Sequence, residues 1–122
     1  MLVAILTIMF LGGGTSAFLD YIADSKDAVK TVMVKDARQK EALNILKSMK
    51  KRSKGHSKQV RKTIKELEQL IEGRDDNTAE IAAIGDRSFE NIESYDRDIL
   101  GLRFELKEYV TREEWAQIFP EQ

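Results

Sequence analysis

Apolar and small residues recur at steps of three and four along two long segments, residues 46–70 and 81–109. This spacing is the heptad pattern of packed α-helices, in which a narrow apolar row faces a neighbouring helix. No proline occurs between Asp20 and Leu106, and β-branched runs are sparse, so helix is the expected state. The first row consists of Leu46, Met49, Ser53, His56, Val60, Thr63, Leu67 and Leu70, with Ile64 and Ile71 widening it. The second row consists of Ile81, Gly85, Ser88, Ile92, Tyr95, Ile99, Leu102, Leu106 and Tyr109.

A polar bend separates the two rows. Gly73 suits the left-handed position after a helix end, and Asp75 and Asp76 follow it closely. Asn77 can cap the next helix, with Glu80 three positions later to reach back to the cap. A connection this short requires the two helices to lie antiparallel as neighbours. The pattern therefore predicts an all-α chain whose largest part, residues 42–110, is an antiparallel, coiled-coil-like helical hairpin.

The hairpin register predicts which residues face each other. The first row keeps its phase through Gly55, so residues 51–58 are predicted to continue one helix rather than form a linker. The expected cross-helix pairs are Leu70 with Ile81, Val60 with Ile92, His56 with Tyr95, Leu46 with Leu106, and Arg52 with Asp98.

The open end of the predicted hairpin carries more apolar residues than a two-helix seam needs. Leu43, Ile45, Leu100 and Phe104 fall outside the two rows and require a cover. Residues 111–114 match a capping box, which predicts a short helix over residues 111–119 that folds back and buries Trp115. The alternative is that this end is a seam between two copies. Either way the candidate protein-interaction residues are Leu100, Phe104, Trp115 and Phe119.

Residues 20–41 precede the hairpin and are predicted to be helical. Apolar residues gather on one side of the segment between Phe18 and Lys40, with no obvious partner within the chain. We therefore expect either a helical stalk leading from a membrane or a self-association surface. The apolar positions are Phe18, Tyr21, Ile22, Val29, Val32 and Met33.

Residues 1–19 contain no charged side chain, although the rest of the chain carries all 20 Lys and Arg and all 21 Asp and Glu. As a single-pass membrane helix, 19 residues reach roughly 28 Å, just enough for a hydrocarbon core of about 30 Å. As a signal peptide, residues 2–11 form the apolar region, and Thr15–Ala17 supply a small-residue cleavage site after Ala17. Both alternatives bring the chain to a membrane, on either its cytoplasmic or its exported side.

The composition contains few of the residues that catalytic sites commonly use. The chain has no cysteine and a single histidine, and its net charge is −1. Disulfides, Cys–zinc sites and thiol chemistry are therefore excluded, and no phosphate-loop, dinucleotide, serine-hydrolase or zinc-protease motif occurs. We expect no catalytic residues and no cofactor, so the chain is predicted not to be an enzyme.

The most distinctive surface feature is a run of seven basic residues without an acid between Lys50 and Lys62. Helical spacing places several of these cations, together with Lys65, on one outer face. Such a face can simply be solvated, or it can attract anionic lipid or an envelope polymer. Nucleic acid is an unlikely partner because no aromatic residues interleave with the cations. We call this set the basic stripe; it consists of Lys51, Lys54, Lys58, Arg61, Lys62 and Lys65.

His56 lies in the apolar row, where a histidine commonly belongs to a polar layer, here with Tyr95 or Ser53. Its alternative role is a metal ligand or a pH switch, with Glu93 or Asp96 from the facing helix as partners.

Two functional hypotheses follow. The first is a non-enzymatic, membrane-tethered or exported helical hairpin of the cell envelope that binds macromolecules or itself. The second is a small periplasmic stress chaperone or a metal or acid sensor.

Overall fold

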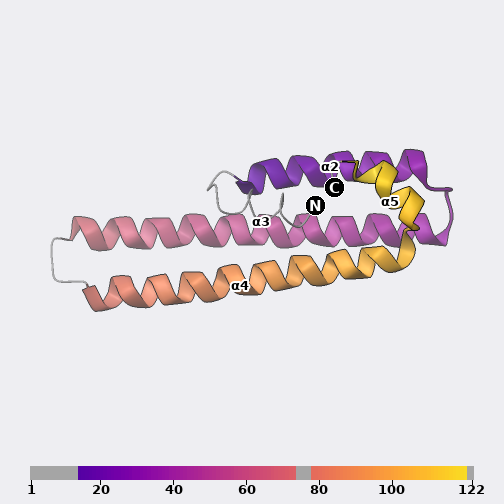
Figure 1. The fold of residues 1–122 in the computed structure, drawn as a ribbon. Helices are drawn as coiled ribbons and strands as arrows, with labels where there is room; N and C mark the ends of the chain where they lie inside the picture. The colour runs from indigo at the N-terminus through magenta and orange to yellow at the C-terminus, as the bar shows by residue number, and fades with distance from the viewer. Residues whose placement is uncertain (1–13, 74–77, 121–122) are drawn as a thin grey trace.

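The computed structural model describes residues 14–73 and 78–120, which form helices and no strands. The helices are α2 (Gly14–Val32), α3 (Ala37–Glu72), α4 (Thr78–Tyr109) and α5 (Arg112–Ile118). Figure 1 shows α3 and α4 as two long antiparallel helices, with α2 lying along part of α3 and α5 at the open end. The prediction of an all-α chain with a long helical hairpin is confirmed in this architecture.

The seam of the hairpin follows the two apolar rows. Helix α3 continues through Gly55 without a break, as the unbroken phase of its row predicted. Leu46 and Leu106 belong to one buried core, and Val60 and Ile92 line the same hollow between the helices. The register read from the sequence is therefore the register of the fold.

The bend differs in detail from its prediction. Gly73 has φ −67° and ψ −14°, which is right-handed helical backbone, so the predicted left-handed conformation is wrong. Its N–H still donates to the carbonyl of Gln69 at 3.1 Å, which extends the helical pattern by one residue. The predicted cap at Asn77 lies outside the described residues.

Helix α2 corrects the expectation that residues 18–40 lack an intrachain partner. Its apolar side is buried in the common core, packed against α3 and α5. The helix ends at Val32, and the chain reverses before α3 begins at Ala37, so residues 20–41 are not one continuous stalk. The reason is that α3 has apolar surface left after pairing with α4, and α2 covers it. The buried residues of this layer are Phe18, Ile22, Val29, Met33, Ala42, Ile45 and Met49.

The reversal between α2 and α3 is held by side-chain hydrogen bonds. Asp36 caps α3 by accepting a hydrogen bond from the Gln39 backbone N–H at 3.1 Å. The Gln39 side chain is buried and donates to the carbonyl of Met33 at 3.2 Å. These bonds satisfy polar groups at the junction of the two helices, where an unpaired group would be costly.

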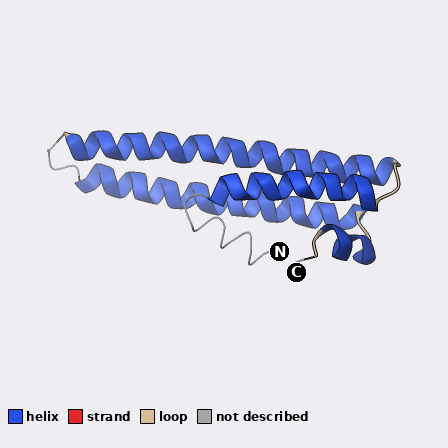
Figure 2. Cartoon of the chain, turned by 90° about the horizontal axis from the view of Figure 1, so that it is seen from above, coloured by secondary structure: helices blue, strands red, loops and turns tan. Residues whose placement is uncertain are grey.

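Helix α5 forms where the capping box predicted it. The Thr111 hydroxyl accepts from the Glu114 N–H, and the Glu114 carboxylate accepts from the Thr111 N–H. Trp115 and Phe119 are buried there. Figure 2 shows this short helix at the open end of the hairpin. Its partner there is α2, a contact that the sequence did not predict.

The first 13 residues carry the predicted membrane anchor or signal peptide and lie outside the described residues. Residues 14–19 of the predicted N-terminal apolar helix belong instead to α2, and Ala17, after which cleavage was expected, lies inside that helix. Across residues 14–73 and 78–120, none of the helices combines the length and apolar character that a bilayer crossing requires.

Candidate functional site

The basic stripe is an exposed surface of α3. All six of its side chains are exposed to solvent. Arg61 donates to the hydroxyl of Ser57 at 3.2 Å, one turn earlier. Within the part of the chain that the structure describes, none of the six cations forms an ion pair. The stripe therefore presents uncompensated positive charge along several turns of one helix.

A polar layer lies beneath the stripe, at the centre of the hairpin. The rings of His56 and Tyr95 stack at a centroid distance of 4.1 Å and an interplanar angle of 1°. The hydroxyls of Tyr95 and Ser53 are hydrogen-bonded at 2.7 Å. At the edge of the layer Arg52 pairs with Asp98 at 2.8 Å and lies over the Tyr95 ring at 5.4 Å. The predicted pairs His56–Tyr95 and Arg52–Asp98 are thus confirmed.

Burial shapes the proton affinities of this layer. It lowers the pKa of His56 below its ordinary value of 6.5, and the positive charge of Arg52 lowers it further. Burial also raises the pKa of Tyr95, against the opposing effects of the Ser53 hydrogen bond and of Arg52. Both groups are therefore held in their neutral forms. A stacked neutral imidazole fits a structural layer that responds to acid.

A hollow of about 120 Å³ lies in the seam beside His56 and is lined almost entirely by apolar atoms. Two of its lining residues contribute buried polar atoms without a hydrogen-bond partner, His56 Nδ1 and Ser88 Oγ. Residues 14–73 and 78–120 hold no group of three or more His, Asp or Glu side chains suited to a metal ion. Burial and the neighbouring Glu93 raise the pKa of Asp96, one of the two metal partners suggested for His56.

The four predicted protein-interaction residues differ in their exposure to solvent. Trp115 and Phe119 are buried in the chain's own core, where their rings lie 4.6 Å apart. Leu100 is half-buried, and Phe104 is exposed, so α5 does not cover it as expected. The four residues therefore do not form one surface patch.

A pocket of about 530 Å³ opens beside these residues, at the junction of α4 and α5. Trp115 and Phe119 supply its apolar wall, while Lys107 and Arg112 add two cations. No pattern in the sequence indicates this pocket, because its shape depends on how α5 turns back.

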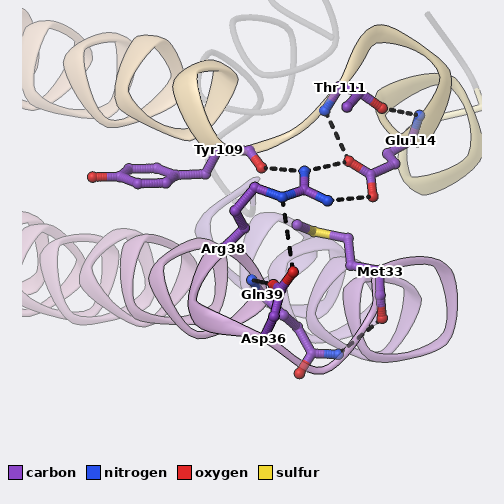
Figure 3. A network of polar contacts seen from close by, with 7 residues as sticks. All are labelled: Met33, Asp36, Arg38, Gln39, Tyr109, Thr111 and Glu114. Atoms are coloured by element: carbon purple, nitrogen blue, oxygen red, sulfur yellow. Dashed lines mark hydrogen bonds and ion pairs between the residues drawn. The ribbon is translucent and has the colours of Figure 1, made fainter.

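An ion-pair network at the open end was also absent from the sequence-based predictions. Arg38 donates to the Glu114 carboxylate at 2.9 Å and to the carbonyl of Tyr109 at 3.1 Å, as Figure 3 shows. Asp36 lies on the other side of Arg38, at 4.0 Å. The hydrogen bond from Arg38 lowers the pKa of Glu114, as does the bond from the Thr111 N–H. One arginine thus joins the start of α3 to the end of α4 and the start of α5.

Comparison of the chain with protein-family models, with curated proteins and with solved structures gave no match. The functional conclusion therefore depends on the chain's own residues and geometry.

The depressed pKa of His56 predicts that the folded state loses stability in mild acid. Below about pH 6.5 the unfolded chain binds a proton more readily than the folded chain, so the free energy of unfolding falls as the pH falls. Urea titrations between pH 7.5 and 5.5 will show this slope, and His56→Gln is expected to flatten it. The raised pKa of Asp96 acts in the opposite direction and cannot produce the slope. An equal slope in His56→Gln would contradict the assignment.

Proposed function

We propose that this chain is a non-enzymatic, membrane-associated helical protein of the cell envelope that acts by binding macromolecules or itself. The observation that carries the proposal is the basic stripe, which has six exposed cations and no ion-paired acid among the described residues. Each Lys or Arg near an anionic membrane surface contributes about 1 kcal/mol of attraction. Anionic lipid headgroups are therefore the preferred partner of the stripe.

The surface chemistry supports lipid over nucleic acid as this partner. The exposed face that carries the stripe has no aromatic residue among its cations, so it offers no platform on which bases could stack. Phosphate headgroups need only a row of point charges, which lysines supply. Residues 1–11 of the sequence are apolar apart from one threonine, and in this proposal they supply a second means of membrane attachment.

Reversing three charges of the stripe is expected to weaken binding to anionic vesicles about 100-fold, because roughly 1 kcal/mol is lost per cation. The variant is Lys54→Glu/Lys58→Glu/Arg61→Glu. Cosedimentation of the full chain measures binding to phosphatidylcholine vesicles with and without phosphatidylglycerol. The readout is the ratio of the affinity for vesicles with phosphatidylglycerol to the affinity for vesicles without it. Apolar attachment contributes to both affinities, so this ratio reports the contribution of the stripe.

The matched control reverses three exposed lysines elsewhere, in Lys30→Glu/Lys35→Glu/Lys40→Glu. It has the same net charge as the stripe variant and should keep a larger share of the anionic preference. Equal losses in both triple variants would indicate a non-specific charge effect. No anionic preference in the native chain would reject the stripe as a lipid site.

A small periplasmic stress chaperone or an acid or metal sensor is the second candidate function. The specific observation that favours its acid-sensing form is the buried histidine stacked on Tyr95. Flattening of the pH dependence in His56→Gln tests this candidate directly.

A further inference from the structure

The pocket between α4 and α5 combines an apolar lining with positive charge. Its volume is about 530 Å³, which is within the range of pockets that hold small molecules. The apolar lining comes mainly from Val110, Trp115 and Phe119, and two exposed cations, Lys107 and Arg112, line the same pocket. None of the described residues that line it is acidic. The pocket therefore presents an apolar surface and positive charge side by side.

The two cations of the pocket have no acidic partner among residues 14–73 and 78–120. Neither Lys107 nor Arg112 forms an ion pair there. The carboxylate of Glu114, also on α5, is already bound by Arg38 at 2.9 Å and accepts a hydrogen bond from the Thr111 N–H. It is therefore engaged at the start of α5 and does not neutralise the pocket.

Two buried N–H groups at the pocket also lack an acceptor. Trp115 Nε1 and Arg103 Nε are both buried and have no hydrogen-bond partner among the described residues. The Arg103 guanidinium lies 5.5 Å from the centroid of the Trp115 ring, and the Lys107 ammonium lies 5.7 Å from it. A buried donor without an acceptor is costly, and native proteins rarely keep one. Donors and cations thus exceed acceptors around this indole, which is the complement of an anionic head group.

We propose that this pocket binds an amphipathic anion, a single apolar chain that ends in a carboxylate or a similar head group. The chain packs against Trp115 and Phe119, and the head group lies near Lys107 and Arg112, which form charge-assisted hydrogen bonds with such groups. An inorganic anion would leave the apolar lining uncovered, and a neutral apolar molecule would make no use of the cations. The pocket shares no residue with the basic stripe, which belongs to α3, so the inference does not depend on the proposed function.

Fluorescence tests the proposal directly, because Trp115 lines the pocket and is the only tryptophan of the chain. Bromine quenches tryptophan emission only at short range, so a brominated ligand in the pocket will lower the signal. The probe is ω-bromooctanoate, titrated into the full chain, and ω-bromooctanol is its uncharged counterpart. Quenching by the carboxylate is expected to saturate. Its half-maximal concentration should be about tenfold lower than that of the alcohol, since a hydrogen bond to a charged group contributes roughly this factor.

Variants at exposed positions separate the charge of the pocket from its shape. Lys107→Gln/Arg112→Gln is expected to raise the half-maximal concentration of the carboxylate about tenfold and to leave that of the alcohol unchanged. The matched control, Arg61→Gln/Lys65→Gln, removes one arginine and one lysine from the exposed face of α3 and should change neither value. Ala116→Phe adds a ring at an exposed lining position of α5 and should weaken both ligands.

Each other outcome overturns the proposal. Quenching that rises without saturation would show partitioning rather than a site. Equal half-maximal concentrations for the carboxylate and the alcohol would show that the cations do not select the ligand. An equal loss in the Arg61/Lys65 variant would indicate a non-specific charge effect, and unchanged quenching in Ala116→Phe would place the ligand outside the pocket. Circular dichroism of each variant verifies that the helices are retained, so a loss of binding is a loss of the site.

Discussion

Replacing Phe119 by alanine is expected to destabilise the folded chain by about 3 kcal/mol, since large aromatic residues in cores lose roughly this amount on truncation. Phe119 is buried and lies 6.0 Å from the Tyr21 ring and 4.6 Å from the Trp115 ring. Truncation therefore removes an aromatic contact between α2 and the end of α5. The free energy of unfolding from urea titration, followed by circular dichroism, measures the loss.

Phe104→Ala is the matched control for this experiment. It makes the same chemical change at an exposed position of α4, so a loss of less than about 0.5 kcal/mol is expected. If both variants lost the same amount, α5 would not be docked as described. A large loss in Phe119→Ala alone ties the stability of the chain to the α2–α5 contact.

Replacing Tyr95 by alanine is expected to cost about 4 kcal/mol, because Tyr95 is the largest fully buried side chain among the described residues. The change removes the stacking partner of His56 and the hydrogen-bond partner of Ser53. Urea unfolding measures this loss too. A loss below 1 kcal/mol would contradict the central position of Tyr95 in the seam.

Tyr95→Phe separates the hydroxyl from the ring. It preserves the stacked geometry but leaves the buried Ser53 hydroxyl without its partner, which costs about 1–2 kcal/mol. Adding Ser53→Ala to Tyr95→Phe should recover part of the loss, because both halves of the hydrogen bond are then gone. A double-variant loss equal to the sum of the single losses would show no coupling between the two groups.

The helical hairpin was predictable because its information is local and repeated. The periodic rows fix which side of α3 and α4 is apolar, and the short bend leaves one way to pair them. The register then follows, which is why the pairs His56–Tyr95 and Arg52–Asp98 were found from the sequence. The capping box of α5 was equally local, since Thr111 and Glu114 lie three residues apart.

The third layer of the fold could not be predicted in this way. The apolar side of α2 was visible in the sequence, but a periodic pattern indicates only that a face needs covering. The same limit applies to Arg38 and Glu114, which lie 76 positions apart and meet only after α5 folds back. For Gly73 the sequence supplied a preference, and the local hydrogen bonding gave a right-handed conformation instead.

By itself the sequence determined the helices, the hairpin register and the exposed basic stripe, because these depend on spacings of three, four and seven residues. Tertiary structure alone decided that α2 packs on α3 and α5, and that Phe119 is internal while Phe104 stays exposed. These features depend on which of several apolar faces meet. That choice is made by shape and chain connectivity across long sequence separations, which a periodic pattern does not encode.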